Sequence, residues 1–188
     1  MKTYTIIGGV NGTGKSSFTG VLRNSDPELG VIIDVDKLMA EKGGNAILGG
    51  KAALKMLREC LHNGVSFTQE TTLSGYLTAQ TAKAAAEKGY AVRLFYVGLD
   101  TAEESLLRIQ NRVRRGGHDI AAEDVLRRFE SRWESVGRVL PFCAQAEFFD
   151  NDNGFVKTAE YHNGELVLIG EYHPSWVLEL QKWLRESR

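Results

Sequence analysis

The stretch Gly9-Val10-Asn11-Gly12-Thr13-Gly14-Lys15-Ser16 reads G-x-x-x-x-G-K-S and decides the fold. Its glycines allow backbone conformations in which successive N–H groups point inward and surround a polyphosphate. A β-branched and aromatic run at residues 3–7 predicts a strand before it, and a helix is expected to begin near Lys15. Strand, loop and helix in this order are the setting of a phosphate-binding loop. In such a loop the lysine reaches the β- and γ-phosphates and the serine hydroxyl binds Mg²⁺.

An ordinary glycine-rich turn is the alternative interpretation of this stretch, but agreement at every specified position favours the phosphate loop. Lys15 is also a catalytic candidate, because its charge is expected to lie beside the transferred phosphoryl group. The nucleotide contacts predicted from the loop and the start of its helix are Gly9, Asn11, Gly12, Thr13, Gly14, Lys15, Ser16 and Ser17.

Length and composition favour one globular domain over residues 1–188. The chain is 43% hydrophobic and 25% charged, with a net charge of −1. This near-neutral balance argues against a nucleic-acid or membrane-surface partner. The sequence has no apolar run long enough to span a bilayer and no signal peptide, so a cytoplasmic location is expected. Cys60 and Cys143 lack metal or redox spacing and are expected to be reduced thiols.

Strands and helices are expected to alternate along the chain. Further strands are predicted at residues 31–33, 65–69, 91–97 and 146–149, and helices at 15–23, 46–62, 77–88, 101–112, 122–139 and 174–185. The apolar run 31–33 is typical of a strand buried on both faces of a parallel sheet. Asn163-Gly164 predicts a hairpin between residues 155–161 and 165–171. This alternation predicts an α/β fold whose ligands bind at the carboxyl ends of parallel strands.

Carboxylates follow two of the expected strands. The second strand leads into Asp34-Val35-Asp36, and because residues two apart on a strand share a face, both carboxylates are expected to leave the sheet together. Asp36, or else Asp34, is then the candidate base for an attacking hydroxyl, and the other could hold a Mg²⁺-bound water. The alternative is that this pair caps a helix beginning near Lys37. Glu70 is expected to orient Mg²⁺-bound water or to bind substrate hydroxyls, or else to bind backbone N–H groups of the next turn. The substrate-side candidates are Asp34, Asp36, Glu70, Thr71 and Thr72, and the metal candidates are Ser16, Asp34 and Glu70.

Seven arginines lie within residues 108–132, and Gly116-Gly117 offers a hinge, so this segment is interpreted as a lid. The arginines are Arg108, Arg112, Arg114, Arg115, Arg127, Arg128 and Arg132. A guanidinium matches phosphate oxygens and stays charged. Neighbouring acids are expected to pair with three or four of the seven. Arg112 and Arg128 are the predicted phosphate contacts, followed by Arg115. His118 could serve the lid, although a hydrogen bond that braces the loop is favoured.

These residues resemble the zeta-toxin-like kinases, which include small bacterial proteins often labelled ABC-type ATPases. The resemblance covers about residues 3–154. It is carried by residues 9–17, Asp36, the run Glu70-Thr71-Thr72-Leu73-Ser74-Gly75, and residues 108–128 with Gly116-Gly117-His118-Asp119. It implies a P-loop NTPase fold with a five-stranded parallel sheet of order 2-3-1-4-5, followed by the hairpin and helix of residues 155–188. It also implies ATP and Mg²⁺ as cofactors, phosphorylation of UDP-N-acetylglucosamine, and an antitoxin partner.

Carried over by position, the resemblance assigns a role to each part of the site. Lys15 and Ser16 bind phosphate and Mg²⁺, and Asp36 is the base. Glu70 and Thr71 face the substrate or metal. Arg112 and Arg128 clamp phosphates, and Asn151 lies near the adenine side. The chain departs from the family at Asp34-Val35-Asp36, where Asn-Pro-Asp is usual, and at Asp150-Asn151-Asp152, where Asp-Asn-Ser is usual.

Several function classes stay open at this stage. A kinase for a small hydroxyl acceptor comes first, with UDP-N-acetylglucosamine as the first candidate acceptor. The Asp-x-Asp run is also similar to shikimate-kinase-like enzymes, so a shikimate- or gluconate-kinase-like enzyme is an alternative. A nucleotide-gated protein whose lid reports to a protein partner is another. A polynucleotide 5′-kinase is disfavoured by the net charge, and a GTPase by the lack of an Asn-Lys-x-Asp motif.

Overall fold

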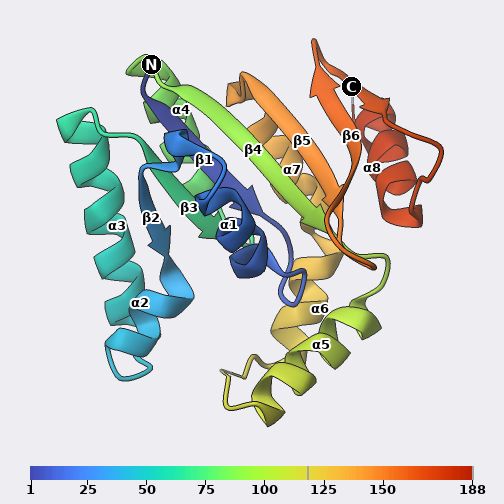
Figure 1. Ribbon diagram of the computed structural model, residues 1–188, viewed down its shortest axis with the longest axis horizontal. Coiled ribbons are helices and arrows are strands. Elements are labelled where there is room, and N and C mark those ends of the chain that lie inside the picture. Colours follow the sequence, from blue (N-terminus) through green and yellow to red (C-terminus); the bar gives the residue numbers. More distant parts are fainter. Residues whose placement is uncertain (118, 188) are drawn as a thin grey trace.

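A twisted, mostly parallel sheet forms the centre of the molecule (Figure 1). The computed structural model describes residues 1–117 and 119–187, so the interpretation of His118 lies outside the described residues. Within them, seven strands follow the order β2-β3-β1-β4-β5-β6-β7. Their bounds are β1 (Thr3–Gly8), β2 (Val31–Asp34), β3 (Phe67–Thr71), β4 (Ala91–Gly98), β5 (Gln145–Asp150), β6 (Val156–His162) and β7 (Glu165–Leu168). The first five are parallel in the expected order, and the antiparallel β6 and β7 extend the sheet beyond them.

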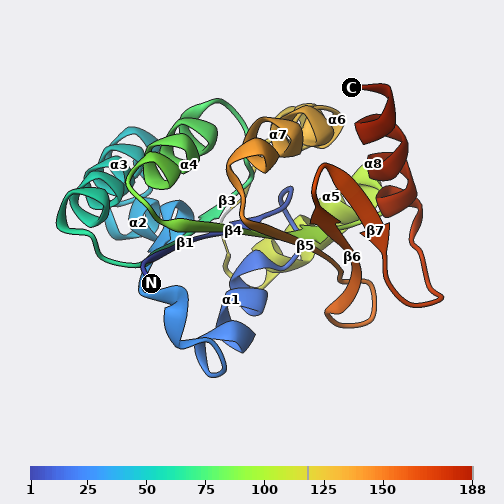
Figure 2. The same ribbon diagram turned by 90° about the horizontal axis from the view of Figure 1, so that it is seen from above.

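Helices cover both faces of this sheet. Their bounds are α1 (Lys15–Arg23), α2 (Val35–Glu41), α3 (Ala46–Asn63), α4 (Leu77–Glu87), α5 (Ala102–Arg114), α6 (Ala122–Glu130), α7 (Arg132–Val139) and α8 (Ser175–Glu186). Figure 2 shows α3, α4 and α7 on one face and α1 on the other. Short 3₁₀ turns occupy Pro27–Leu29 and Leu140–Phe142. None of the described helices is long and apolar enough to cross a membrane.

Aromatic side chains from several elements pack together in the larger of the two core clusters. Tyr4 of β1 stacks on Phe67 of β3, with ring centroids 4.4 Å apart. Farther along, Tyr96 contacts Trp133 of α7 and Trp176 of α8. The apolar residues of α6 and α7 that face the core are buried, namely Val125, Phe129, Trp133 and Val136. A smaller apolar cluster lies under α1. A close-packed core therefore holds the carboxyl ends of the parallel strands in place.

The hairpin and the cysteines agree with the sequence. Asn163 and Gly164 both have positive φ, at 52° and 88°, as a two-residue type I′ turn requires. Cys60 and Cys143 are free thiols.

Three expectations about the elements were wrong in detail. The second strand lies at the edge of the sheet, so Val31 is 38% exposed while Ile33 is fully buried. The third strand lies two residues later than expected, at Phe67–Thr71, and therefore includes Glu70. The expected helix 122–139 is two helices that meet at Ser131, whose hydroxyl donates to the Arg127 carbonyl at 2.9 Å. Such a bond to the preceding turn bends helices.

Candidate active site

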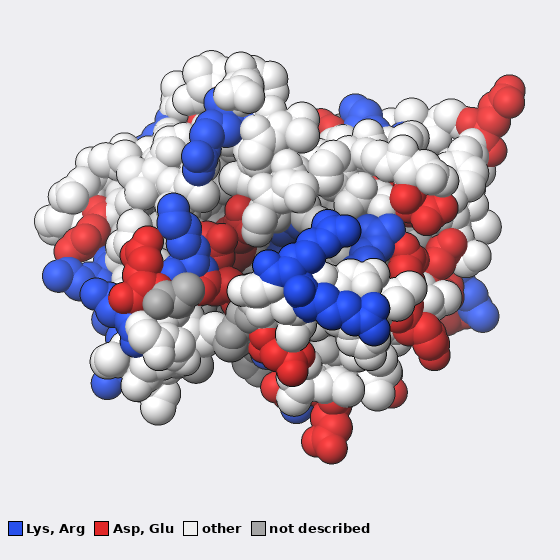
Figure 3. Space-filling model, turned by 60° about the horizontal axis from the view of Figure 1, so that its bottom comes forward, with Lys and Arg blue, Asp and Glu red and all other residues white. Residues whose placement is uncertain are grey.

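A cavity of about 370 Å³ opens where the ends of β2 and β3 meet the phosphate loop and α5. Its lining includes most of the predicted site residues: Asn11, Gly12, Gly14, Lys15, Ser16, Ser17, Asp34, Asp36, Glu70, Thr71, Thr72, Arg112 and Arg128. Figure 3 shows the matching face of the molecule, on which basic side chains gather beside acidic ones. Cations and carboxylates thus meet at one end of the sheet.

Lys15 lies inside the loop that precedes it. Its ammonium donates to the carbonyls of Gly9 at 2.9 Å and Val10 at 3.0 Å. Burial lowers the pKa of Lys15 to about 8, although the nearby carboxylates of Asp36, Glu70 and Asp34 act in the opposite direction. Among these carboxylates Asp36 has the largest effect. The candidate base and the loop lysine therefore interact electrostatically across one cavity.

The two aspartates reach the cavity by a route that the sequence did not predict. β2 ends at Asp34, and Asp36 already lies in the first turn of α2, so they are not residues two apart on one strand. The side chain of Asp34 accepts a hydrogen bond from the Lys37 backbone N–H at 3.1 Å and so caps this helix. Asp36 is exposed and lines the cavity beside it. The capping alternative thus describes Asp34, while Asp36 is available to a ligand.

Glu70 is joined to the phosphate loop. Ser16 donates from its hydroxyl to Glu70 Oε2 at 2.7 Å, and Glu70 is buried. Within the part of the chain that the structure describes, no three Cys, His, Asp or Glu side chains gather as a closed metal site would need. Mg²⁺ keeps several waters and takes only one or two protein ligands beside phosphate oxygens. The donor set of Ser16, Glu70 and Asp34, which offers oxygen alone, fits that kind of site.

The threonines that follow Glu70 have partners of their own. Thr71 Oγ1 accepts from the Leu73 backbone N–H at 3.0 Å and lies 3.3 Å from the Thr78 hydroxyl. The hydroxyls of Thr72 and Ser74 are 2.7 Å apart. Both Thr71 and Thr72 border the cavity.

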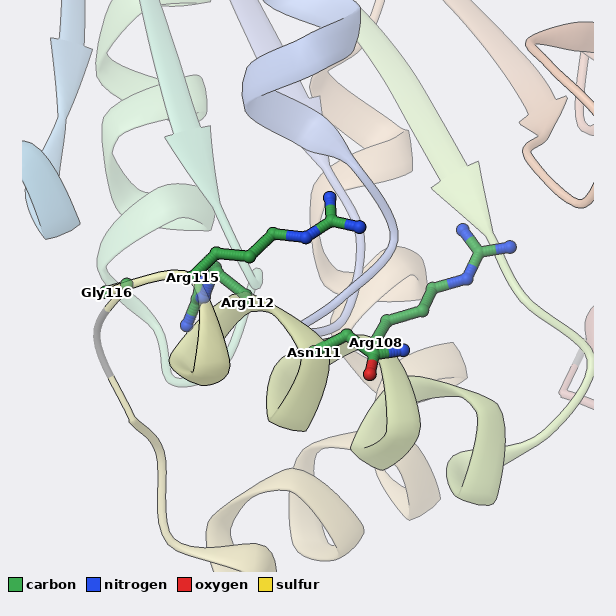
Figure 4. A pocket seen from close by; sticks show the side chains of 6 residues that line it. Arg108, Asn111, Arg112, Arg115 and Gly116 are labelled. Atoms are coloured by element: carbon green, nitrogen blue, oxygen red, sulfur yellow. The ribbon is translucent and has the colours of Figure 1, made fainter.

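The two preferred arginines reach the cavity from different helices. Arg128 of α6 donates from Nη1 to the Asn11 side-chain oxygen at 3.0 Å. Arg112 of α5 borders this cavity and a neighbouring one of about 550 Å³. Arg115 lines only the neighbouring cavity, which Figure 4 shows from close by. The structure therefore brings Arg112 and Arg128 to the phosphate loop and leaves Arg115 outside the main cavity.

Asn151 ties the end of β5 to the phosphate loop. Its amide donates to the Thr13 carbonyl at 2.8 Å, and its own carbonyl accepts from Arg108 Nη2 at 2.7 Å. Next to it, Asp150 accepts from the Trp176 indole N–H at 2.8 Å. The loop is thus braced from the carboxyl end of a strand more than a hundred residues away.

Two residues of this site were not among the phosphate or substrate contacts predicted from the sequence, although Arg108 was named as one of the seven lid arginines. Arg108 lines the main cavity, one helical turn before Arg112, and pairs with Glu104. Ser105 donates from its hydroxyl to the Asn11 carbonyl. The spacing of Arg108 and Arg112 is the signal that could have found the first, because residues four apart share a helix face. The sequence carries no signal for Ser105.

Comparisons with known proteins agree with this geometry. The family model described as zeta toxin matches residues 50–160. A protein of Haemophilus influenzae is 34% identical over 124 aligned residues, a match that covers 63% of this chain and 86% of that protein. The family match includes Glu70 and the arginine segment but not the phosphate loop. The loop therefore supports the family assignment independently of this match.

Solved structures share the fold at low identity. A chain from the PezAT toxin–antitoxin system of Streptococcus pneumoniae has a TM-score of 0.66 at 18% identity, covering 99% of this chain and 85% of that one. A chain of the AvrRxo1-ORF1:-ORF2 complex with ATP has a TM-score of 0.67 at 16% identity, covering 96% of this chain and 63% of that one. With a phosphate loop at the end of a 2-3-1-4-5 sheet and a family match over residues 50–160, this chain belongs to the zeta toxin family.

Proposed function

We propose that this protein transfers the γ-phosphoryl group of ATP to a hydroxyl of a small molecule, with UDP-N-acetylglucosamine as the first candidate. The observation that carries the proposal is the position of Asp36. This exposed carboxylate borders the same cavity as Lys15, and it raises the pKa of Lys15 more than Glu70 or Asp34 does. Family membership supports a phosphotransferase of the P-loop type.

Positioning and charge would supply most of the rate. The transferred phosphoryl group spreads negative charge over its oxygens in a loose transition state. Lys15, Arg112 and Arg128 all line the cavity in which this charge would develop. Donors that already point at the developing charge need no reorganisation during the reaction.

Asp36 is assigned as the general base. A carboxylate within hydrogen-bond reach of the acceptor hydroxyl takes its proton as the oxygen approaches phosphorus. Asp34 already accepts a backbone hydrogen bond, so it is the weaker candidate. Thr71 and Thr72 border the space that remains for the acceptor.

Ser16, Glu70 and Asp34 are assigned to a Mg²⁺ ion that enters with the nucleotide. Bound there, the ion would neutralise phosphate charge and orient the phosphate chain. The Ser16 hydroxyl and the Glu70 carboxylate are already held together at 2.7 Å. These side chains therefore need little rearrangement to offer their oxygens.

A partner protein of the antitoxin kind is a further part of the proposal. The PezAT system, to which one structural neighbour belongs, contains an antitoxin. If this chain has such a partner, the partner is expected to suppress phosphoryl transfer in the assay described next.

A transfer assay tests the function. The protein is incubated with γ-labelled ATP, Mg²⁺ and either UDP-N-acetylglucosamine or a bacterial metabolite extract, and the labelled product is identified by mass spectrometry. Asp36→Asn is expected to retain Mg·ATP affinity and lose transfer by about 100-fold or more. Glu41→Gln, at the exposed end of the same helix, is the matched control.

The outcomes separate the function classes. Equal transfer by Asp36→Asn and wild type would remove the base assignment. A labelled product other than the sugar nucleotide would support the shikimate- or gluconate-kinase-like alternative. ATP turnover that no metabolite stimulates, and only a protein does, would support a nucleotide-gated binding protein instead.

A further inference from the structure

Asn11 is the residue at which both arginine-bearing helices meet the phosphate loop. Its backbone carbonyl accepts a hydrogen bond from the Ser105 hydroxyl of α5. Its side-chain oxygen accepts from Nη1 of Arg128 on α6 at 3.0 Å. Asn11 itself is only 5% exposed. A buried side chain with one cationic partner has a defined orientation, because leaving either group unpaired there is costly.

The loop and α5 are in contact at the neighbouring residue. A Cβ on Gly12 would lie 2.8 Å from the backbone oxygen of Ser105, closer than a real Cβ contact. Gly12 has a φ of +81°, which a residue without a side chain adopts readily. The helix therefore rests directly on the loop, and the distance between the arginines and the cradle is set by backbone contact.

Arg128 is held chiefly through Asn11. Its Nε is buried and has no hydrogen-bond partner within the described residues, whereas Nη1 is bonded to the Asn11 amide oxygen. Arginine has many rotamers, so an unheld guanidinium would have to be ordered when the nucleotide binds. An amide oxygen orders it without cancelling its charge, which a carboxylate in the same place would do.

We propose that Asn11 is a positioning residue that holds the Arg128 guanidinium over the phosphate cavity before nucleotide binds. The inference rests on the proposed function, since Arg128 is assigned there to the γ-phosphate. It gives Asn11, a side chain of the loop itself, the task of presenting a cation from another helix. A direct contact between Asn11 and phosphate is not required.

A double-mutant cycle tests this role without any acceptor. Dissociation constants are measured by calorimetry, in the presence of Mg²⁺, for ADP and for the β,γ-imido analogue of ATP. The dissociation constant for ADP divided by that for the analogue reports the contribution of the γ-phosphate to binding. Arg128→Ala is expected to lower this ratio about tenfold, and Asn11→Ala about three- to tenfold. The double variant is expected to match Arg128→Ala alone, because Asn11 acts through Arg128.

Two further variants keep the test decisive. Asn11→Leu fills a similar volume without an acceptor, so it replaces Asn11→Ala if the smaller side chain unfolds the loop. Arg127→Ala is the matched control, since Arg127 is exposed on the same helix and pairs with Asp124. The positioning role is overturned if the Asn11 substitution leaves the ratio at the wild-type value, or lowers it equally with and without Arg128. Wild-type protein that binds neither ligand would instead contradict the proposed function.

Discussion

The Ser16 hydroxyl donates a 2.7 Å hydrogen bond to Glu70, a residue 54 positions later in the chain. The register of the sheet explains this meeting. β1 and β3 are parallel neighbours in which Ile7 pairs with Glu70 and Gly8 with Thr71. The end of β3 is therefore level with the start of the phosphate loop. A carboxylate at this register position lies beside the loop serine.

Glu70→Gln tests the proposed metal site. The amide keeps an acceptor for Ser16 but loses the negative charge, so the Mg²⁺ concentration that gives half-maximal activity is expected to rise about tenfold. Affinity for ATP without Mg²⁺ is expected to stay equal or improve, because a charge near the triphosphate is gone. Glu87→Gln, an exposed residue of α4, is the control. An unchanged Mg²⁺ requirement would contradict the role of Glu70.

Lys15 is expected to make the proposed phosphoryl transfer depend on pH. Its pKa in the free protein is about 8, and only the charged form neutralises phosphate. Because kcat/KM reports ionisations of the free enzyme, kcat/KM for ATP is expected to fall as pH rises through about 8. The fall in kcat is expected at higher pH, since bound phosphate favours the ammonium. A pH series checks this, and Lys15→Arg should remove the fall near 8; a fall that persists would assign it to another group.

The same lysine affects folding stability. Its pKa falls from 10.5 to about 8 on folding, so between these values the unfolded chain binds more protons than the native one. The contribution of Lys15 to the free energy of unfolding of the nucleotide-free protein is therefore expected to increase as pH rises from 8 to 10.5. Urea unfolding of wild type and Lys15→Met at several pH values measures it. Parallel pH curves for the two proteins would contradict a lowered pKa.

Two glycines in and beside the loop should respond in opposite directions to alanine. Gly12→Ala is expected to destabilise the protein by about 2 kcal/mol and to abolish nucleotide binding, because a Cβ meets the Ser105 backbone at positive φ. Gly20→Ala, within α1 and with open space around it, is expected to stabilise the protein by up to about 1 kcal/mol. Urea unfolding and nucleotide titration check both. Equal effects would mean that α5 does not rest on the loop as described.

Trp176 joins the C-terminal helix to the site. Its ring lies against Gly98, and its N–H donates to the buried Asp150 at 2.8 Å. Trp176→Phe is expected to lower the free energy of unfolding by about 2–3 kcal/mol, since it leaves a void and an unpaired carboxylate oxygen. Trp183→Phe, a half-buried residue of the same helix, is expected to cost about 1 kcal/mol or less. Thermal and urea unfolding distinguish the two, and similar losses would argue against the Asp150 contact.

Local chemistry explains why much of this protein could be predicted. A loop of eight residues specifies its own strand–loop–helix setting, because its glycine conformations and N–H groups depend on short-range geometry. The Asn163-Gly164 turn and the Thr101 cap were likewise predictable, and Thr101 does accept from the Glu104 N–H. These features depend on neighbours within a few residues, so the sequence contains everything they need.

Other features depended on contacts between distant segments. β2 ends at Asp34, Asp36 lies in α2, and β3 begins at Phe67. These bounds depend on how the edge strand β2 pairs with β3. The separation of Arg128 from Arg115 is likewise decided by how α5 and α6 pack on the loop. Seven arginines close together in sequence look alike until their helices are placed.

The sequence by itself determined the phosphate loop, the alternation of strands and helices, and the kinds of side chain near a phosphate. Those follow from residue type and short spacing. Only the tertiary structure decided which aspartate caps a helix and which faces the cavity, and that Asn11 meets Arg128 across 117 positions. The reason is physical: a hydrogen bond between distant residues exists only after the packing of the sheet and helices has brought its two atoms together.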